Sequence, residues 1–486
     1  MRIFFLILIV CQMTGMLHSQ SFSYLHVTDS DDYAVDIFTL PDSSYQMICF
    51  ATANNNSIFS PYAVHLNKQG IYMGVKSLED TSLSNYYMLK FVPIDVNNFY
   101  AIASVSKKEI SYNSVDIMLI KYDANLDTLW TKIYKTNDTT EYVTNAVLNP
   151  TNKELILSGF YYKGINQASG PIPYFMLLDS MGAVINKFYE DTFGYTCSIG
   201  YDYNNKIILG ATLFYPNLQT HKYSFNSNLN SFDTCSIFET GLNASFLCLQ
   251  SNKFISTYDQ YHWQWNSTSL RISLTDSNCN IFKTAELGQS GIDERMALFH
   301  GLDSVSKNRI IIAGTSNFDY GFAYFSNHQG QFHCAVLDDS LNIIWEKNAG
   351  DFAYHFLYRA MPTYDGGVIA VGSRYDYIKN FPPVSRDPIV MKFDSLGNIQ
   401  GSYDNNNQYQ SMFNVYPNPA SDILNIEALD NLEYDYEVYN ITGDRLMQGE
   451  LKSHTKINIL KFSSGVYYLK IVSKKGSSFK KFLVTH

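Results

Sequence analysis

The chain has 486 residues, of which 46% are hydrophobic, 15% are aromatic and only 16% are charged. This composition excludes a disordered chain and is typical of a β-rich protein with a packed core; the length exceeds one ordinary core, so two folded units are expected. The formal net charge of -10 repels phosphate backbones, and no basic cluster offsets it in the first 405 residues, so nucleic acid is not expected as a partner.

The amino terminus predicts a secretory signal peptide over residues 1–20. Arg2 precedes an unbroken apolar run from Ile3 to Val10, and the small residue Ser19 follows. The run is too short to cross a bilayer, and no later stretch of 18 apolar residues exists, so no transmembrane segment is predicted. Cys11 raises the alternative of a lipid anchor, but Val10 is a poor residue for the position before it. The mature chain is expected outside the cytoplasm.

Export permits disulfide bonds, but the spacing of the remaining cysteines fixes no pairing. Six cysteines follow the signal, and no CxxC pair occurs, which disfavours a zinc site or a redox pair: Cys49, Cys197, Cys235, Cys248, Cys279 and Cys334.

A hairpin signal recurs along the next 385 residues. Its best copy runs from Phe332 to Trp345, where an apolar run meets Asp338-Asp339-Ser340 and apolar residues resume at Ile343. Seven copies are anchored at Asn67, Asp123, Asp179, Asn226, Asp276, Asp338 and Asp394. A second apolar segment precedes each hairpin, at residues 45–50, 99–103, 154–159, 206–210, 254–258, 309–314 and 367–372.

The repeat predicts a seven-bladed β-propeller over residues 21–405. Seven repeats divide this region into units of about 55 residues, which is enough for four short strands and their connections. Repeats of this length indicate arrays or propellers. A β-solenoid, an eight-bladed ring and two sandwiches are the alternatives.

A different pattern follows a polar linker at residues 406–412. Residues 413–486 contain six or seven alternating strand signals with Gly and Asn at the turns, which predicts a small antiparallel β-sandwich of the Ig-like kind. Pro417 and Pro419 cannot donate to a strand ladder, so the start of this domain is expected at a sheet edge.

Four motifs of this segment resemble the type A C-terminal sorting domain of cargo of the bacterial type IX secretion system. They are Tyr416-Pro417-Asn418-Pro419, the turn that ends at Gly443, Gly465 with Tyr467, and the basic-aromatic end that contains Lys480 and Lys481. The resemblance implies export to the periplasm, passage across the outer membrane by the type IX machinery, and a secreted or surface location. One departure is the ending Thr485-His486, since the family commonly stops at or near a basic residue.

No motif predicts a catalytic residue or a bound cofactor. The sequence lacks GxSxG, HExxH and a P-loop, so an enzyme is not favoured. Three hairpin turns, which begin at Asp123, Asn226 and Asp276, alternate oxygen-bearing side chains as calcium loops do, but they lack the distal Glu. Asp and Asn also favour turns through local hydrogen bonds, and this interpretation is preferred to calcium binding.

One aromatic stretch is a candidate ligand face. Tyr261, Trp263 and Trp265 could stack on sugar rings or contact a partner protein. The alternative is a strand whose aromatic side chains pack inside the propeller. Together, the sequence predicts an exported propeller that binds a surface or glycan ligand; the rival hypotheses are a secreted propeller enzyme that acts on glycans and a structural component of a surface layer.

Overall fold

The computed structural model of the chain divides into two compact units, residues 1–401 and 402–486. It describes residues 21–399 and 413–485, in a few strands by the backbone alone, except for short internal segments at 29, 53–58, 79–82, 108–114, 136–138, 164–169, 203, 215–218, 227–228, 238–240, 251–252, 263, 265, 307, 322–324, 378–384, 429–433, 441–443, 453 and 474–475. The predicted signal peptide and the predicted linker therefore lie outside the described residues.

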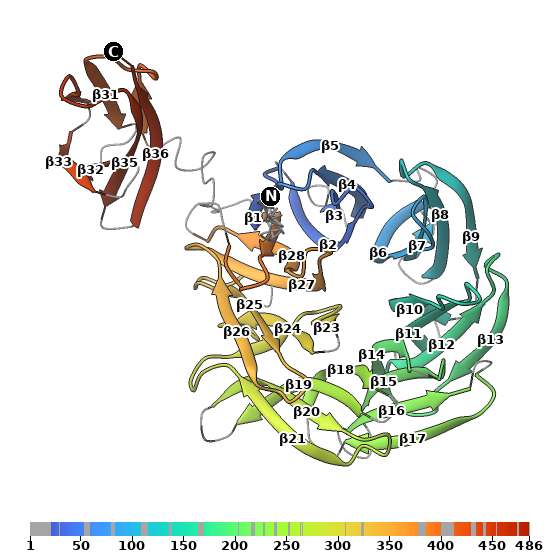
Figure 1. Cartoon of the computed structure of the whole chain (residues 1–486). Helices are drawn as coiled ribbons and strands as arrows, with labels where there is room; N and C mark the ends of the chain where they lie inside the picture. The colour runs from blue at the N-terminus through green and yellow to red at the C-terminus, as the bar shows by residue number, and fades with distance from the viewer. Residues whose placement is uncertain are drawn as a thin grey trace, which may run out of the picture. The chain divides into compact units, whose positions relative to one another are not determined.

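Every regular element in the described residues is a β-strand, and none of these residues forms a helix that could cross a membrane. In the first unit the strands form seven antiparallel sheets, six of four strands and one of five. The sheets stand around a central opening (Figure 1). This is the arrangement of a β-propeller.

Each sheet has one strand at the centre of the ring and one at its rim (Figure 1). The strands nearest the centre are β2 (Asp31–Thr39), β6 (Leu83–Pro93), β10 (Thr139–Leu148), β14 (Gly194–Tyr201), β18 (Gly241–Gln250), the pair β22 (Glu294–Met296) and β23 (Leu302–Ser306), and β27 (Tyr354–Pro362). The second strands are β3 (Tyr45–Thr52), β7 (Asn98–Lys107), β11 (Leu155–Lys163), β15 (Ile207–Leu213), β19 (Lys253–His262), β24 (Arg309–Ser316) and β28 (Val368–Tyr375). The apolar segments that recur in the sequence are these second strands.

The third and fourth strands form the recurring hairpins. The third strands are β4 (Phe59–Leu66), β8 (Asp116–Asp123), β12 (Ile172–Leu178), β16 (Gln219–Phe225), β20 (Ser267–Thr275), β25 (Gln331–Leu337) and β29 (Arg386–Phe393). The rim strands are β5 (Tyr72–Ser77), β9 (Thr128–Tyr134), β13 (Val184–Tyr189), β17 (Phe232–Ile237), β21 (Ile281–Leu287), β26 (Ile343–Ala349) and β1 (Phe22–Leu25).

The two ends of the first unit close the ring in one sheet. Strand β1, from the amino terminus, pairs with β29 in the register Phe22 to Lys392, and so supplies the rim strand of the last sheet. Arg386 on β29 also donates two hydrogen bonds to the carboxylate of Asp31 on β2, at 2.8 and 2.7 Å. The rim strand of the last sheet therefore comes from the start of the chain.

Contacts between sheets run all the way round the ring. In order, β6 contacts β2 and β4, β10 contacts β6 and β8, β14 contacts β10 and β12, β18 contacts β14 and β16, β22 contacts β19 and β20, β27 contacts β24 and β25, and β2 contacts β28 and β29. Apolar side chains fill these contacts; Ile102 and Leu119 of one sheet pack in one buried cluster with Leu157 and Tyr174 of the next. The core thus consists of layers between the sheets.

One face of the ring carries all the tight turns, and we call it the turn face. In an antiparallel sheet the first and third turns lie at the same end. In each of the seven hairpin turns, the residue three positions after the Asp or Asn anchor has positive φ: Gly70, Leu126, Gly182, Leu229, Cys279, Leu341 and Gly397. The anchor carboxylate fixes this conformation; Asp338 Oδ1 accepts hydrogen bonds from the backbone of Ser340 at 2.9 Å and Asn342 at 2.8 Å.

Each hairpin turn contacts the preceding sheet, and we call this contact a latch. Lys76 on β5 pairs with Asp127 at 2.6 Å, and Lys283 on β21 donates to the Ser340 carbonyl at 2.6 Å. The remaining latches are Tyr134 to the Gly182 carbonyl, Asn186 to Asn230, the Cys235–Cys279 disulfide, Arg309 to the Ser395 carbonyl, and Phe22 packed against Gly70. Cys49 and Cys334 are buried and free, as expected for thiols inside strands.

The second unit consists of two sheets with a shared core. One sheet is β30 (Phe413–Tyr416), β31 (Ile423–Ala428) and β34 (His454–Asn458); the other is β33 (Arg445–Leu451), β32 (Tyr434–Tyr439), β35 (Gly465–Ser473) and β36 (Gly476–Val484). Leu424 and Ile457 of the first sheet pack in one cluster with Leu469 and Phe482 of the second. Strand β30 is an edge strand, so the prolines that follow it interrupt no ladder.

Candidate functional site

The face opposite the turns carries the longer connections, and we call it the loop face. It holds the ends of the second strands, the starts of the third strands and the crossings between sheets. Six aromatic side chains here are 37 to 57% exposed: Phe193, Tyr195, Phe214, Tyr261, Tyr320 and Phe352. Among the described residues of the tight turns, only Tyr364 is aromatic. Of the two faces, exposed aromatic side chains therefore gather on the loop face; four more lie on rim strands, at Tyr72, Tyr189, Phe232 and Phe282.

Part of this aromatic group forms one continuous patch. The ring of Tyr195 lies 4.9 Å from that of Phe160 and 5.4 Å from that of Phe214, both in edge-to-face contact. Phe160 stacks in turn on Tyr142 at 5.2 Å. Such contacts hold the exposed rings in place and leave their outer faces available to a ligand. Sequence analysis missed this patch, although aromatic residues at several strand ends are a signal that could have found it.

Only one residue of the predicted ligand face is described. Tyr261 lies near the end of β19 on the loop face, 37% exposed, and its hydroxyl donates to Asn266 Oδ1 at 2.8 Å. Trp263 and Trp265 lie outside the described residues. Tyr258, which belongs to the same aromatic stretch, is fully buried in the core. The predicted face therefore stays a prediction for its two tryptophans.

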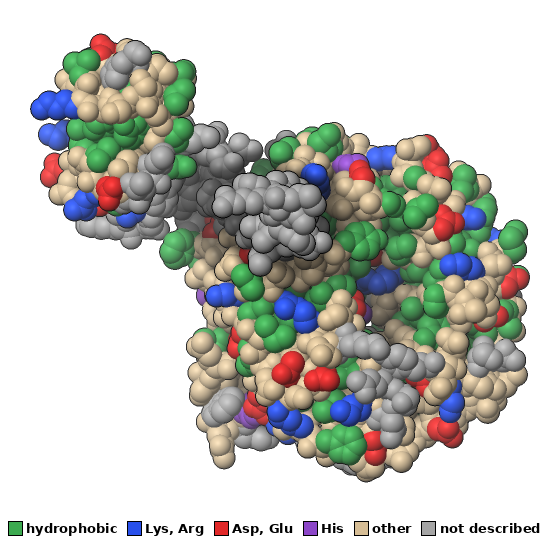
Figure 2. All heavy atoms as spheres, in the orientation of Figure 1, with side chains coloured by type: hydrophobic (Ala, Val, Ile, Leu, Met, Phe, Trp, Pro, Cys, Tyr) green, Lys and Arg blue, Asp and Glu red, His purple; other side chains and the backbone are tan. Residues whose placement is uncertain are grey.

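A second candidate site lies among the strands nearest the centre. We call it the channel cluster. It consists of Asp36 on β2, Lys90 on β6, His300 just before β23, Asp303 on β23, and Arg359 on β27. Figure 2 shows basic side chains in the hollow at the centre of the ring. These residues come from four consecutive sheets and are far apart in the sequence, so no sequence motif marks them.

Irregular pairing places these side chains. Asp36, Lys90 and Arg359 each follow a bulge in the pairing of their strand with the second strand of the same sheet. A bulge re-aims the side chains next to it, and bulges are common beside functional sites. His300 bridges the backbone of Arg359 in parallel, which brings the β23 and β27 residues together.

The carboxylates of the channel cluster are fully engaged. Asp36 accepts hydrogen bonds from the backbone of Ile37 at 2.9 Å and Phe91 at 2.8 Å, and its Oδ1 lies 3.2 Å from Arg359 Nε. Asp303 accepts from the Ser304 backbone at 2.7 Å and lies 3.1 Å from His300 Nε2. Arg359 Nη1 is buried and has no hydrogen-bond partner among the described residues.

Burial shapes the charge of the basic members. Burial, and then the nearby Arg359 guanidinium, lower the pKa of Lys90 to about 7, against the opposite influence of Asp36 and Asp303. Burial also lowers the pKa of His300. Near neutral pH, Lys90 therefore titrates and His300 is mostly the neutral base.

The hairpin turns that resemble calcium loops use their oxygens within the protein. Asp123 Oδ1 accepts from the backbone of Asn125 and Asp127, and Asp276 Oδ1 accepts from Asn278 and Asn280, at 2.8 to 2.9 Å. Among the residues that the structure describes, no group of three His, Cys, Asp or Glu side chains is placed to hold a metal ion. Calcium binding stays untested.

The first and last motifs of the second unit meet at its last strand, β36. Asn418 Oδ1 accepts from the Leu483 backbone at 2.9 Å, while the Ala420 backbone donates to the Leu483 carbonyl at 2.8 Å. The first motif thus fastens β36, the strand that carries Lys480 and Lys481, whose side chains lie outside the description. Gly443 also lies outside it.

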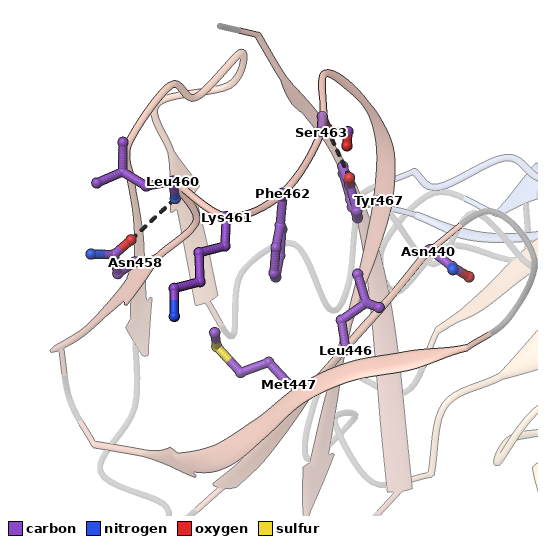
Figure 3. Close-up of a pocket in the computed structure, with 9 residues that line it drawn as sticks. All are labelled: Asn440, Leu446, Met447, Asn458, Leu460, Lys461, Phe462, Ser463 and Tyr467. Carbon is purple, nitrogen blue, oxygen red and sulfur yellow. Dashed lines mark hydrogen bonds between the residues drawn. The ribbon is translucent and has the colours of Figure 1, made fainter.

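A groove of about 780 Å³ opens beside the other motif of this unit. The ring of Tyr467, on β35, stacks on that of Phe462 at 5.0 Å, and its hydroxyl donates to the Ser463 carbonyl at 2.8 Å. Lys461 and Met447 point into the same groove (Figure 3). The groove joins apolar surface to one positive charge.

Comparison with known proteins identifies the second unit. Residues 414–485 match the family model described as the secretion system C-terminal sorting domain. The resemblance predicted from the sequence is confirmed: this unit is a sorting domain of the type IX system, which implies export through that system and a secreted or cell-surface location. No curated protein is detectably similar in sequence to the whole chain.

Solved structures resemble the chain weakly. It is similar to an acylaminoacyl peptidase of Pyrococcus horikoshii (10% identity, TM-score 0.43, covering 82% of this chain and 58% of that one). It is similar to the propeller domain of the Trilobed protease of Pyrococcus furiosus (11%, 0.43, 77% and 98%) and to the Pan2 WD40 domain of Neurospora crassa (9%, 0.41, 77% and 99%). The chain spans less than two thirds of the length of the peptidase.

Proposed function

We propose that this exported protein is a binding or adhesion module whose ligand, a surface or glycan molecule, contacts the loop face of the propeller. In this proposal each of the seven sheets is one blade of a domain over residues 21–405, the linker is residues 406–412, and the tail is an Ig-like sandwich. The signal peptide over residues 1–20 starts the export route that the sorting domain completes.

The gathering of exposed aromatic rings on one face carries the proposal. Tyr, Trp and Phe supply large contact area at low entropic cost, and they dominate binding surfaces in soluble proteins. Phe193, Tyr195 and Phe214 lie on the sheet next to that of Tyr261, so Trp263 and Trp265, which connect β19 to β20, would extend the same surface. Loops on a rigid scaffold are also where binding residues concentrate.

The test is a glycan array probed with the full-length protein and with matched variants. The variant Phe193→Ala/Tyr195→Ala/Phe214→Ala should lose about tenfold or more in affinity for any glycan bound, because two or three ring contacts are removed. Phe282→Ala/Tyr364→Ala removes two rings that are 61 and 78% exposed but lie on the rim and the turn face, and it should bind as the wild type does. Equal binding by both variants would refute the loop-face assignment.

A secreted enzyme that acts on glycans is the second candidate. The observation that favours it is the His300–Asp303 pair beside Lys90, because a neutral imidazole held by a carboxylate is the usual form of a general base. Release of new reducing ends or unsaturated sugars from a glycan on the array would decide for the enzyme.

We also propose that the groove beside Tyr467 belongs to the surface that the secretion machinery contacts. Fractionated cells should retain in the periplasm a chain that lacks residues 413–486, and Leu460→Asp, at a 59% exposed position of the groove, should slow export without unfolding the domain. Ile423→Asp, 40% exposed on β31 and outside the groove, is the control. Full export of the truncated chain would contradict the sorting role itself.

A further inference from the structure

The channel cluster contains basic groups that the protein itself does not satisfy. Both of its carboxylates have their own donors, as described above, whereas Arg359 Nη1 has no hydrogen-bond partner although the Arg359 side chain is only 2% exposed. Among the residues that the structure describes, none forms a hydrogen bond or an ion pair with Lys90 Nζ. A buried donor without an acceptor costs about 1–3 kcal/mol, so such a group points to a missing acceptor.

The cluster is open on its basic side. Lys90 is half-buried, and the side chains of His300 and Asp303 are 24 and 29% exposed, while Arg359 and Asp36 lie beneath them, each 2% exposed. Asp303 turns its oxygens to His300 and to the Ser304 backbone. Lys90 and His300 are therefore the basic members of the cluster that a small ligand can reach from solvent, whereas the Arg359 charge is buried.

Electrostatics favours an anion at this position. The groups that act on Lys90 are Arg359 from β27, Asp36 from β2 and Asp303 from β23; His300 stands beside Asp303. Arg359 and two backbone amides balance the charge of Asp36, and Asp303 is hydrogen-bonded to one amide and to His300, which is mostly neutral. Lys90 is therefore the cation of the cluster that no contact neutralises, and an entering anion would pair with it in a setting of lowered dielectric, where such a contact is stronger than in water.

We propose that the channel cluster is an oxyanion-binding site, in which Lys90 and His300 contact one carboxylate, phosphate or sulfate group and Arg359 supplies the charge beneath it. Binding stabilises the charged forms of Lys90 and His300, so the protein takes up protons when the anion binds. The affinity should then be highest below the pKa of Lys90 and should fall as the pH rises through it. The site is independent of the loop-face aromatic patch.

The experiment is isothermal titration of the full-length protein with inorganic sulfate, whose charge is constant over the range used, at fixed ionic strength. We expect saturable binding of one sulfate near pH 6 that weakens about tenfold or more near pH 8.5, because Lys90 loses its charge. Galacturonate, with galactose as its neutral match, tests whether an acidic sugar supplies the oxyanion better than a mineral anion does.

Variants decide the assignment. Lys90→Gln should abolish binding, Lys90→Arg should keep it and lose most of its pH dependence, and Lys68→Gln, at an exposed lysine of a tight turn, should leave it unchanged. Circular dichroism checks that Lys90→Gln is folded. If Lys90→Gln does not fold, sulfate binding by Lys90→Arg, with little pH dependence, tests the assignment in its place. Sulfate and galacturonate binding that is absent from the wild type, or equal in Lys90→Gln and Lys68→Gln, would overturn the proposal. Loss of glycan binding in the aromatic variant with sulfate binding intact would separate the two sites.

Discussion

The turn face and the loop face are built from the same seven repeats, yet they differ in how strictly the repeats agree. On the turn face every hairpin has an Asp or Asn anchor, a positive φ three residues later and a latch to the preceding sheet. On the loop face the connections differ in length and composition from sheet to sheet. The latches add contacts between neighbouring sheets at the turn face, in addition to the buried layers, which leaves the connections of the loop face free to vary and to carry binding residues.

The turn face solves one backbone problem in two ways. Positive φ is costly for residues with a Cβ, by about 1–2 kcal/mol. Leu126, Leu229 and Leu341 accept this cost and bury their side chains, each 3 or 4% exposed. Gly70 and Gly397 avoid it, and a ring of the neighbouring sheet fills the space: Phe22 against Gly70 and Trp345 against Gly397. Either the turn residue or its neighbour completes the core.

The largest expected effect comes from adding a side chain at Gly70, where the Phe22 ring fills the space. A Cβ there would lie 2.2 Å from Phe22 Cδ2, and φ is +79°. Gly70→Ala should therefore lower the free energy of unfolding of the propeller by about 3–4 kcal/mol, from overpacking and backbone strain together. Urea unfolding followed by tryptophan fluorescence measures it.

Two variants sharpen the Gly70 result. Gly74→Ala, on β5 of the same sheet, adds a Cβ that meets nothing within 4 Å and should change stability by less than about 0.5 kcal/mol. Gly70→Ala/Phe22→Ala removes the clash and should be less destabilised than the two single changes predict when added. A full 3 kcal/mol loss in Gly74→Ala would show that the close approach of Phe22 is not the cause.

The next effect concerns the one covalent latch. The Cys235–Cys279 disulfide joins adjacent sheets across 44 residues of sequence, where the other latches use hydrogen bonds, an ion pair or packing. Cys235→Ser/Cys279→Ser should lower the free energy of unfolding by about 2–4 kcal/mol. Lys283→Met, which removes a polar latch at an exposed position, should cost under about 1 kcal/mol. Equal losses in the two variants would mean that the disulfide adds nothing beyond an ordinary latch.

The sequence predicted the turn face well because its determinants are local. An Asp or Asn followed by a turn is legible within five residues, and so are the motifs from Tyr416 to Pro419 in the sorting domain. Closure of the ring by Phe22 was missed because its partner, Lys392, is 370 positions away and β1 is only four residues long. The channel cluster was missed for the same reason: Lys90 and Arg359 meet only once the ring exists.

The smallest expected effect tests the chemistry of the turn face itself. Hydrogen bonds from the backbone and then the side-chain amide of Asn342 lower the pKa of Asp338, and Asp276 and Asp394 have lowered pKa values in equivalent turns. A carboxylate whose pKa is lower in the folded state stabilises the fold at pH values above its pKa in the unfolded state. This stabilisation is lost as the pH falls through the pKa of the folded state. Two other turns use Asn67 and Asn226 at this position, which do not titrate.

Asp338→Asn keeps an acceptor for both amides, so stability near neutral pH should change by less than about 0.5 kcal/mol, while the loss of stability below about pH 4 should become shallower. Thermal unfolding across that range, with Asp339→Asn as the control at the adjacent residue, measures the difference. An unchanged acid limb in Asp338→Asn, or the same flattening in Asp339→Asn, would show that the turn carboxylates do not set the acid stability of this face.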